Sequence, residues 1–328
     1  MKDVIIVTGA AGFIGFHLCR RLLAQGESVV GLDNLNDYYD PRLKGARLDI
    51  LNRSSRFNFL LGDLCDAEAV ESLVVQNEPR VVYHLGAQAG VRYSLENPRS
   101  YMQSNIEGTF NLLEAVRKAS VEHLLYASSS SVYGNHVKTP FSVNASVDKP
   151  VSFYASSKRA VELMVYAYAC LYGIPSTGLR FFTVYGPFGR PDMAYFSFTK
   201  KILAGEPIDV YHHGELLRDF TFVDDVIDGL IALKEKPPVP DEGSVRHKVY
   251  NLGNSQPVRL DTFIAVLEKH LGKTAERRYL PMQAGDVYET YADITESTQE
   301  LGFIPKVDLE EGLKHFTDWY RGYYEDRK

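Results

Sequence analysis

A tyrosine and a lysine stand four positions apart in the segment Tyr154-Ala155-Ser156-Ser157-Lys158. On a helix this spacing places both side chains on one face. A free tyrosine ionises near pH 10, but an adjacent ammonium group favours the phenolate and lowers the pKa of the phenol. Such a pair is suited to general base catalysis at neutral pH. On an arbitrary helix it would be only a surface contact, so its position in the fold decides its role.

A run of hydroxyl side chains, residues 128–131, precedes this pair and is followed by Val132-Tyr133-Gly134. The apolar residues before the serines predict a strand over residues 124–128. Ligands of open α/β sheets bind at the carboxyl ends of the strands, where hydroxyl groups can share a substrate proton. Serine runs are often only loops, but the order of strand, serines, tyrosine and lysine favours an active site.

Near the N-terminus, an apolar run leads directly into Thr8-Gly9-Ala10-Ala11-Gly12-Phe13-Ile14-Gly15. The three glycines fit a strand–turn–helix unit in which they permit a tight turn, close approach of a pyrophosphate, and close helix–strand packing. The helix expected over residues 16–25 directs its free N–H groups and positive dipole end at the phosphates. These features predict a dinucleotide site.

An acidic residue, Asp33, ends the strand expected over residues 28–32. A carboxylate at this position, roughly 20 residues after the glycines, accepts hydrogen bonds from the adenosine ribose and repels a 2′-phosphate. The sequence therefore favours NAD over NADP.

The elements that must position these residues alternate between strand-like runs and helix-length segments. This alternation predicts an α/β fold, with a doubly wound parallel-sheet Rossmann domain. After residue 182 the chain becomes richer in proline, glycine and aromatic residues, which predicts a smaller mixed α/β lobe that binds the substrate. We expect the NAD-binding domain to comprise residues 1–180 with a returning part near 224–255, and the lobe to comprise residues 181–223 and 256–328.

Composition limits the classes of function. The chain has 328 residues, 45% of them hydrophobic and 24% charged, and a net charge of −6. No basic cluster indicates a nucleic-acid partner. No apolar run approaches the roughly 20 residues that span a bilayer, and the first strand leaves no room for a signal peptide, so we expect a cytoplasmic protein without a membrane partner.

Cys19, Cys65 and Cys170 are expected to be buried apolar residues, and no metal site is expected.

The glycine turn, the serine strand and the Tyr154/Lys158 pair together resemble the extended short-chain dehydrogenase/reductase family over nearly the whole chain. Residues 84–89, 104–109, 179–187 and 218–225 resemble segments of the nucleotide-sugar 4-epimerases within that family. Residues 33–40, 90–94 and 281–287 are most similar to UDP-glucuronate 4-epimerases.

This resemblance implies that Tyr154 removes the proton of the sugar 4-OH while the C4 hydride passes to NAD, aided by Lys158 and Ser129. The 4-keto sugar turns over, and hydride and proton return to the opposite face. The implied NAD-binding residues are Gly9, Gly12, Phe13, Ile14, Gly15, Asp33, Asn34, Asp63, Leu64, Leu85, Ala87, Tyr154 and Lys158. The implied substrate-binding residues are Ser129, Ser130, Ser131, Thr183, Arg190, Arg218 and Asp286.

Within the substrate set, Arg190 is expected to pair with the sugar carboxylate. Arg218 and Asp286 are expected at the diphosphate and the uridine ribose. Because guanidinium groups bind phosphate and carboxylate in a bidentate manner, both arginines suit these roles.

Three other functions remain open. A 4-keto glucuronate loses CO₂ easily, so a UDP-glucuronate decarboxylase is the main alternative, although Ser130 and Ser131 stand where the related decarboxylases and 4,6-dehydratases carry acids. A UDP-glucose/galactose 4-epimerase would use the same catalytic groups. An NAD-binding regulator would not need Tyr154 and Lys158. The broad apolar faces expected on helices over residues 101–119 and 153–172 favour a homodimer.

Overall fold

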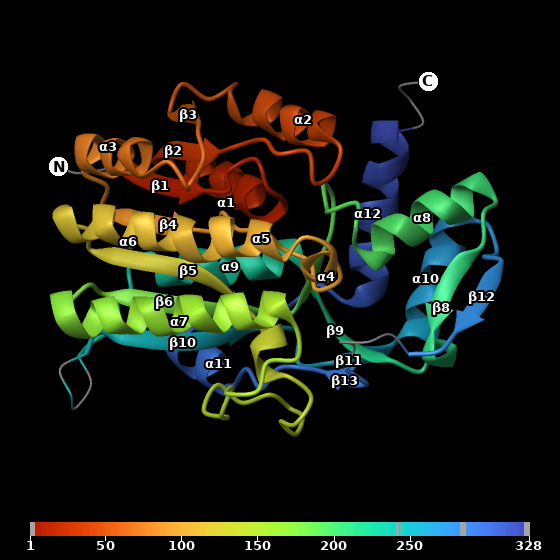
Figure 1. Cartoon of the computed structure of the whole chain (residues 1–328). Helices are drawn as coiled ribbons and strands as arrows, with labels where there is room; N and C mark the ends of the chain where they lie inside the picture. Colours follow the sequence, from red (N-terminus) through yellow and green to blue (C-terminus); the bar gives the residue numbers. More distant parts are fainter. Residues whose placement is uncertain (1–3, 241–242, 244, 283–286, 325–328) are drawn as a thin grey trace.

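The structure is a computed structural model that describes residues 4–240, 243, 245–282 and 287–324. It confirms the predicted α/β fold, because a seven-stranded parallel sheet forms its centre (Figure 1). The strand order is β10-β6-β5-β4-β1-β2-β3. The strands are β1 (Val4–Thr8), β2 (Ser28–Asp33), β3 (Phe57–Leu61), β4 (Val81–His84), β5 (His123–Ser129), β6 (Ser176–Phe181) and β10 (His247–Leu252).

Helices cover both faces of this sheet, so its strands are apolar on both sides. Alternate residues of β1 point to opposite faces: Ile5 and Val7 join one hydrophobic cluster, and Ile6 joins another. The first cluster holds α1 (Phe13–Ala24), α2 (Pro41–Leu51) and α9 (Val223–Leu233) against the sheet. The second cluster holds α3 (Ala67–Asn77), α6 (Gly108–Lys118) and α7 (Phe153–Tyr172).

The strand order determines where along the sheet a ligand is expected to bind. Because β1 lies between β2 and β4, the chain winds away from β1 in both directions, and the carboxyl ends of β1 and β4 flank the point where the order reverses. Ligands of doubly wound sheets bind at such a point. The glycine turn follows β1, and the serine run lies at the end of β5, on the same edge.

A smaller set of elements lies beside the sheet, on the right in Figure 1. β8 (Ile208–Tyr211) pairs with β12 (Arg277–Leu280), and β9 (Leu217–Phe222) is the centre of a second group. That group contains β7 (Thr183–Tyr185), β11 (Pro257–Arg259) and β13 (Glu289–Thr290). The accompanying helices are α8 (Ala194–Ala204), α10 (Leu260–Leu271), α12 (Leu309–Tyr324) and the short turn η3 (His212–Gly214). The helix α11 (Thr295–Leu301) instead packs against β10 of the large sheet and against α9.

The chain passes between the two parts more than once, since β10 returns to the large sheet after β9, and β11 then leaves it again. The division of the chain into domains at residues 180, 223 and 255 stays a prediction. Within the described residues, no helix is long and apolar enough to cross a membrane.

The helix expected over residues 101–119 is interrupted. The structure has α4 (Tyr93–Glu96), α5 (Pro98–Tyr101), a π-helical turn η1 (Met102–Glu107), and then α6. The turn directs the buried Asn105 side chain to the backbone of Gln88. Asn105 Oδ1 accepts a hydrogen bond from the Gln88 N–H at 2.8 Å, and Asn105 Nδ2 donates to the Gln88 carbonyl at 3.0 Å. Gly108 then passes close to Leu64, because a Cβ at Gly108 would lie 2.7 Å from the Leu64 Cβ. These tertiary contacts explain the interruption.

The expectation for the cysteines was wrong for two of the three. Cys19 is buried on α1, but Cys65 is only partly buried and Cys170 is exposed. Cys65 follows Asp63 in the turn after β3, where its backbone N–H donates to the Asp63 carboxylate. Cys170 lies on the outer side of α7, next to the exposed Leu171. Positions on a turn and on an outer helix face do not need a buried apolar side chain.

Candidate active site

The glycine turn after β1 brings backbone unusually close to backbone. Gly9 has a φ of +72°, and a Cβ there would lie 2.7 Å from the Gly86 nitrogen. A Cβ at Gly15 would lie 2.1 Å from the Gly9 carbonyl oxygen. No side chain caps the first turn of α1 at Gly12, so the helix begins with backbone N–H groups available to an anion. This geometry fits a bound pyrophosphate.

Asp33 closes β2 at the side of this turn. Its carboxylate accepts hydrogen bonds from the Ala11 N–H at 3.1 Å and the Leu35 N–H at 2.9 Å. Lys44 Nζ lies 3.8 Å from Asp33 Oδ1 and donates a hydrogen bond to Asn36 Oδ1 at 2.9 Å. Burial lowers the pKa of Lys44, and the Asp33 charge opposes this effect. Sequence reasoning missed Lys44, which stands on α2 a few residues after the motif that begins at Asp33.

A second carboxylate, Asp63, lies beyond the end of β3. It accepts a hydrogen bond from Asn34 Nδ2 at 2.8 Å and from the Cys65 N–H at 2.9 Å. Burial alone would raise the pKa of Asp63, but these hydrogen bonds outweigh it, and the pKa falls below its ordinary value. Asp63 is therefore an ionised acceptor beside the Asp33 loop.

One cavity of about 240 Å³ runs along this edge of the sheet and contacts every predicted cofactor residue. They are Gly9, Gly12, Phe13, Ile14, Gly15, Asp33, Asn34, Asp63, Leu64, Leu85, Ala87, Tyr154 and Lys158. The arrangement fits NAD, because free amide donors at the start of α1, a carboxylate fixed by backbone N–H groups and the Tyr154/Lys158 pair line one cavity. The individual roles of these residues stay predictions.

Tyr154, Lys158 and Ser129 meet at one end of this cavity. Lys158 Nζ donates to the Ala127 carbonyl at 2.9 Å, and the Ser129 hydroxyl lies close enough to the Tyr154 phenol to lower its pKa. Burial lowers the pKa of Lys158 to about 8, further lowered by Arg190 and partly opposed by Glu162. Burial also raises the pKa of Tyr154, while Ser129 and Arg190 lower it. The expectation that Lys158 lowers the pKa of Tyr154 was wrong for the protein alone: burial raises this pKa, and Arg190 is the cation that favours the phenolate.

A second cavity continues from Ser129 and Tyr154 towards β9 and β13. It contacts five predicted substrate residues besides Ser129, namely Ser130, Ser131, Thr183, Arg190 and Arg218. Ser130 and Ser131 belong to the 3-10 turn η2 (Ser130–Tyr133), and the Ser131 hydroxyl donates to Ser129 at 3.0 Å. Asp286 lies outside the described residues. Both cavities share Ser129, Tyr154, Phe181, Phe182, Arg190 and Met193, so Tyr154 stands at their junction, while Lys158 lines the first cavity.

Arg190 is held by a residue that sequence reasoning missed. Its Nε donates to Asp192 at 3.0 Å, and Tyr38 also donates to Asp192 at 3.1 Å. Burial opposes ionisation of Asp192, but Arg190 outweighs it and lowers the pKa of that carboxyl. The spacing of two residues between Arg190 and Asp192 was the available signal. Arg218 on β9 also lines the second cavity, and its Nη1 donates to the Leu217 carbonyl at 2.8 Å.

Comparison with known proteins agrees with this geometry. The family model described as the NAD dependent epimerase/dehydratase family matches residues 5–253. The chain is 47% identical to UDP-glucuronate 4-epimerase 1 of Arabidopsis thaliana over 98% of this chain and 77% of the relative. The structure of the Bacillus cereus UDP-glucuronic acid 4-epimerase in complex with UDP-glucuronic acid and NAD superposes with a TM-score of 0.90 at 35% identity, covering 98% of this chain and 100% of that one. The UDP-glucose 4-epimerase of Thermotoga maritima gives a TM-score of 0.87 at 32% identity, covering 98% and 99%. The chain belongs to the NAD-dependent epimerase/dehydratase family.

Proposed function

We propose that the protein catalyses NAD-dependent 4-epimerisation of UDP-glucuronate to UDP-galacturonate. The observation that carries the proposal is the junction at Tyr154, where a cavity fitted to a dinucleotide meets a cavity of hydroxyl and guanidinium groups. The relatives and structural neighbours named as UDP-glucuronate 4-epimerases support this choice of substrate.

NAD supplies the hydride acceptor at the sugar C4 and the source from which the hydride returns. The chain supplies the proton chemistry. Tyr154 takes the proton of the sugar 4-OH as the C4–H bond breaks and gives it back after the 4-keto sugar has turned over. Ser129 and Arg190 lower the pKa of the phenol, and in this proposal Lys158, held by the Ala127 carbonyl, assists Tyr154. These groups suit general base and general acid catalysis by one residue.

In this proposal Asp33 binds the adenosine ribose, Asp63 and Leu64 lie beside the adenine, and Lys158 also reaches the nicotinamide ribose. Asn34, Leu85 and Ala87 complete the contacts along the cavity. Because the Asp33 carboxylate is already fixed by two backbone N–H groups, it presents a defined negative charge that disfavours a 2′-phosphate.

The substrate end explains why epimerisation is preferred over its alternatives. Among the described residues that line the second cavity, none is Asp or Glu. The hydroxyls of Ser130, Ser131 and Thr183 can hold a carboxylate together with Arg190, but they provide no acid–base pair for elimination. Arg218, with Asp286, binds the nucleotide diphosphate and ribose in this proposal.

The test is to incubate the purified protein with UDP-glucuronate without added reductant and to identify the products by chromatography and NMR. UDP-galacturonate as the product supports the proposal. UDP-pentose with CO₂ would assign the decarboxylase function instead. Conversion of UDP-glucose with none of UDP-glucuronate would assign a neutral hexose as the substrate. NAD binding without turnover of either substrate would favour the NAD-binding regulator instead.

The homodimer belongs to this proposal. α6 and α7 lie side by side on one face of the molecule (Figure 1), and they expose large apolar side chains. These include Phe110, Leu163, Tyr166, Leu171 and Tyr172, each between 45% and 70% exposed. Burying them against a second copy removes apolar surface from water. Light scattering after size exclusion tests this, and a monomer at micromolar concentration would contradict it. The cytoplasmic location stays a prediction.

A further inference from the structure

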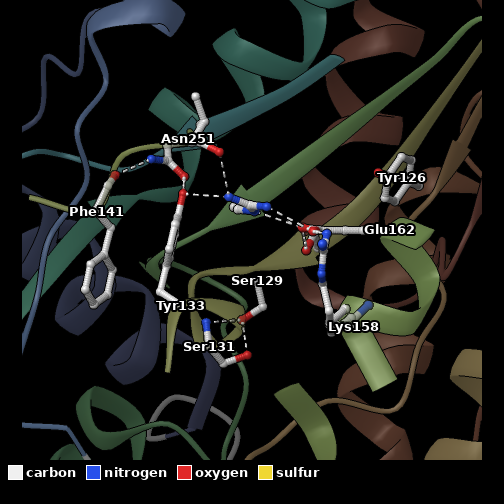
Figure 2. Close-up of polar contacts among 12 residues, drawn as sticks. Tyr126, Ser129, Ser131, Tyr133, Phe141, Lys158, Glu162 and Asn251 are labelled. Atoms are coloured by element: carbon white, nitrogen blue, oxygen red, sulfur yellow. Dashed lines mark hydrogen bonds and ion pairs between the residues drawn. The ribbon is translucent and has the colours of Figure 1, made fainter. Parts of the chain in front are cut away.

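A pair of opposite charges is buried directly behind the serine strand. The side chains of Glu162 on α7 and Arg180 on β6 are 2% and 4% exposed. Arg180 binds the carboxylate with two nitrogens, Nε at 2.8 Å and Nη2 at 3.0 Å (Figure 2). Arg159 adds a third hydrogen bond at 3.0 Å. Burial opposes ionisation of Glu162, but its arginine and serine partners lower the pKa of its carboxyl.

This carboxylate is one of three α7 side chains that hold consecutive residues of β5. Tyr154, Lys158 and Glu162 recur every four residues and therefore share one helical face. The Tyr154 phenol lies beside the Ser129 hydroxyl, which lowers the pKa of the phenol, and Lys158 Nζ donates to the Ala127 carbonyl at 2.9 Å. Glu162 accepts a hydrogen bond from the Ser128 hydroxyl at 2.6 Å.

Hydrogen bonds on the Arg180 side connect the pair to the second cavity. Arg180 donates to the Tyr133 hydroxyl at 3.0 Å, and that hydroxyl donates to Asn251 Oδ1 at 2.7 Å. Asn251 Nδ2 then donates to the carbonyls of Phe141 at 2.7 Å and Asp293 at 3.0 Å. Phe141 lines the second cavity. Figure 2 shows this chain of contacts running from Glu162 past Tyr133 to Asn251 and Phe141, with Ser129 and Ser131 beside it.

Stability alone does not account for such a pair. The desolvation of two buried charges consumes most of their attraction, and well-packed apolar residues of similar size are often as stable. What the charges provide is a fixed geometry, since each bond of the set has a defined direction. The groups held in that geometry are the strand end that carries Ser129 and the turn that carries Ser131.

We propose that Glu162 is a positioning residue for the epimerisation. Through Ser128 and Arg180 it holds the end of β5 so that the Ser129 hydroxyl meets the Tyr154 phenol. The inference rests on the proposed function, because the reaction it positions is that one. Glu162 lines neither cavity and touches no reacting atom; it acts through its neighbours.

Two substitutions interrupt the connection from Arg180 through Glu162 and Ser128 to the end of β5, each at a different residue. Glu162→Gln removes the charge, and Ser128→Ala removes only the hydrogen bond to β5 while the Glu162–Arg180 pair remains. A displacement of the order of 1 Å in an active site lowers rates by about 100-fold, so we expect kcat with UDP-glucuronate to fall about 10-fold to 100-fold in both variants. The KM should change less than kcat, because Thr183, Arg190 and Arg218, which also line the second cavity, are not held by this connection.

The matched control is Glu268→Gln on α10. The Glu268 carboxylate also binds an arginine, Arg277, at 2.9 Å and a backbone N–H, that of Ala275, at 2.8 Å. This variant should retain kcat. The double variant Glu162→Gln/Arg180→Met removes both buried charges and leaves neither without its partner. Its Tm should therefore lie closer to that of the unaltered protein than the Tm of Glu162→Gln does, while its kcat stays low.

A crystal structure of the Ser128→Ala holoenzyme gives a readout independent of turnover, since the Ser129 hydroxyl should move away from the Tyr154 phenol. Unchanged kcat in Ser128→Ala with the Ser129 hydroxyl in its original place would overturn the proposal. Recovery of kcat together with Tm in the double variant would show a structural role only and would also overturn it. Failure of the unaltered protein to convert UDP-glucuronate would instead refute the proposed function, and the crystal structure would still decide the positioning role.

Discussion

Replacing Lys158 with methionine is expected to stabilise the folded protein near neutral pH while removing most of its activity. Burial lowers the pKa of this lysine from 10.5 to about 8, so folding at neutral pH places an ammonium group where its charge is poorly solvated. At about 1.36 kcal/mol for each pH unit between those two values, the cost is about 3 kcal/mol. Methionine has no charge to desolvate.

The loss of one hydrogen bond offsets part of this gain. Lys158 Nζ donates to the Ala127 carbonyl at 2.9 Å, and such a bond from a charged group contributes about 1.5–3 kcal/mol. The net gain near pH 7 is then about 1 kcal/mol. Between pH 8 and 10.5 the unfolded chain binds more protons at this residue than the folded chain does, so the stability of the unaltered protein rises with pH there. The advantage of the variant should therefore shrink and then reverse.

Urea unfolding of the protein, freed of bound nucleotide, measures this difference at a series of pH values from about 7 to 9.5. The control is Lys314→Met, since Lys314 forms an exposed pair with Asp318 at 2.7 Å. Pairs of this kind contribute about 0–1 kcal/mol, and no such reversal is expected for the control. A Lys158→Met difference that stays constant over this range would refute the reasoning.

Three further substitutions test the assigned roles. Tyr154→Phe should lower kcat by about 100-fold to 10,000-fold, since a general base is lost, while the amount of NAD that copurifies is unchanged; near-normal turnover would contradict the role of Tyr154. Arg190→Ala should raise the KM for UDP-glucuronate by about 10-fold to 100-fold through loss of a charged hydrogen bond, and an equal rise for UDP-glucose would mean that Arg190 does not bind the carboxylate. Asp33→Asn should weaken NAD binding, measured by calorimetry, and reduce the preference for NAD over NADP. An unchanged preference would show that another residue excludes the 2′-phosphate.

The parts of the fold that follow from local pattern could be predicted from the sequence. The helix expected over residues 153–172 corresponds to α7, because the Ser152 hydroxyl caps its start at the Ala155 N–H and Gly173 ends it with a φ of +66°. The helix expected over residues 101–119 could not be predicted correctly, because its π turn depends on Asn105 binding Gln88. That contact joins segments whose pairing no local pattern specifies.

The same distinction applies to the site. The glycine turn, Asp33 and the Tyr154/Lys158 pair carry their signal in spacing and order, so they could be found without coordinates. Lys44 carries no such signal, and the spacing of Asp192 from Arg190 is only a weak one, since a lysine or an aspartate near a motif is usually a solvated surface residue. The Glu162–Arg180 pair was missed for a further reason: only the packing of α7 on β6 shows that both charges are buried.

The central claim is that a hydride leaves the sugar C4 and returns to the same carbon. The most direct test is to convert UDP-glucuronate that carries deuterium at C4 in ordinary water and to examine the product by NMR. The account predicts UDP-galacturonate that retains deuterium at C4. UDP-galacturonate with hydrogen at C4, taken from the solvent, would contradict it.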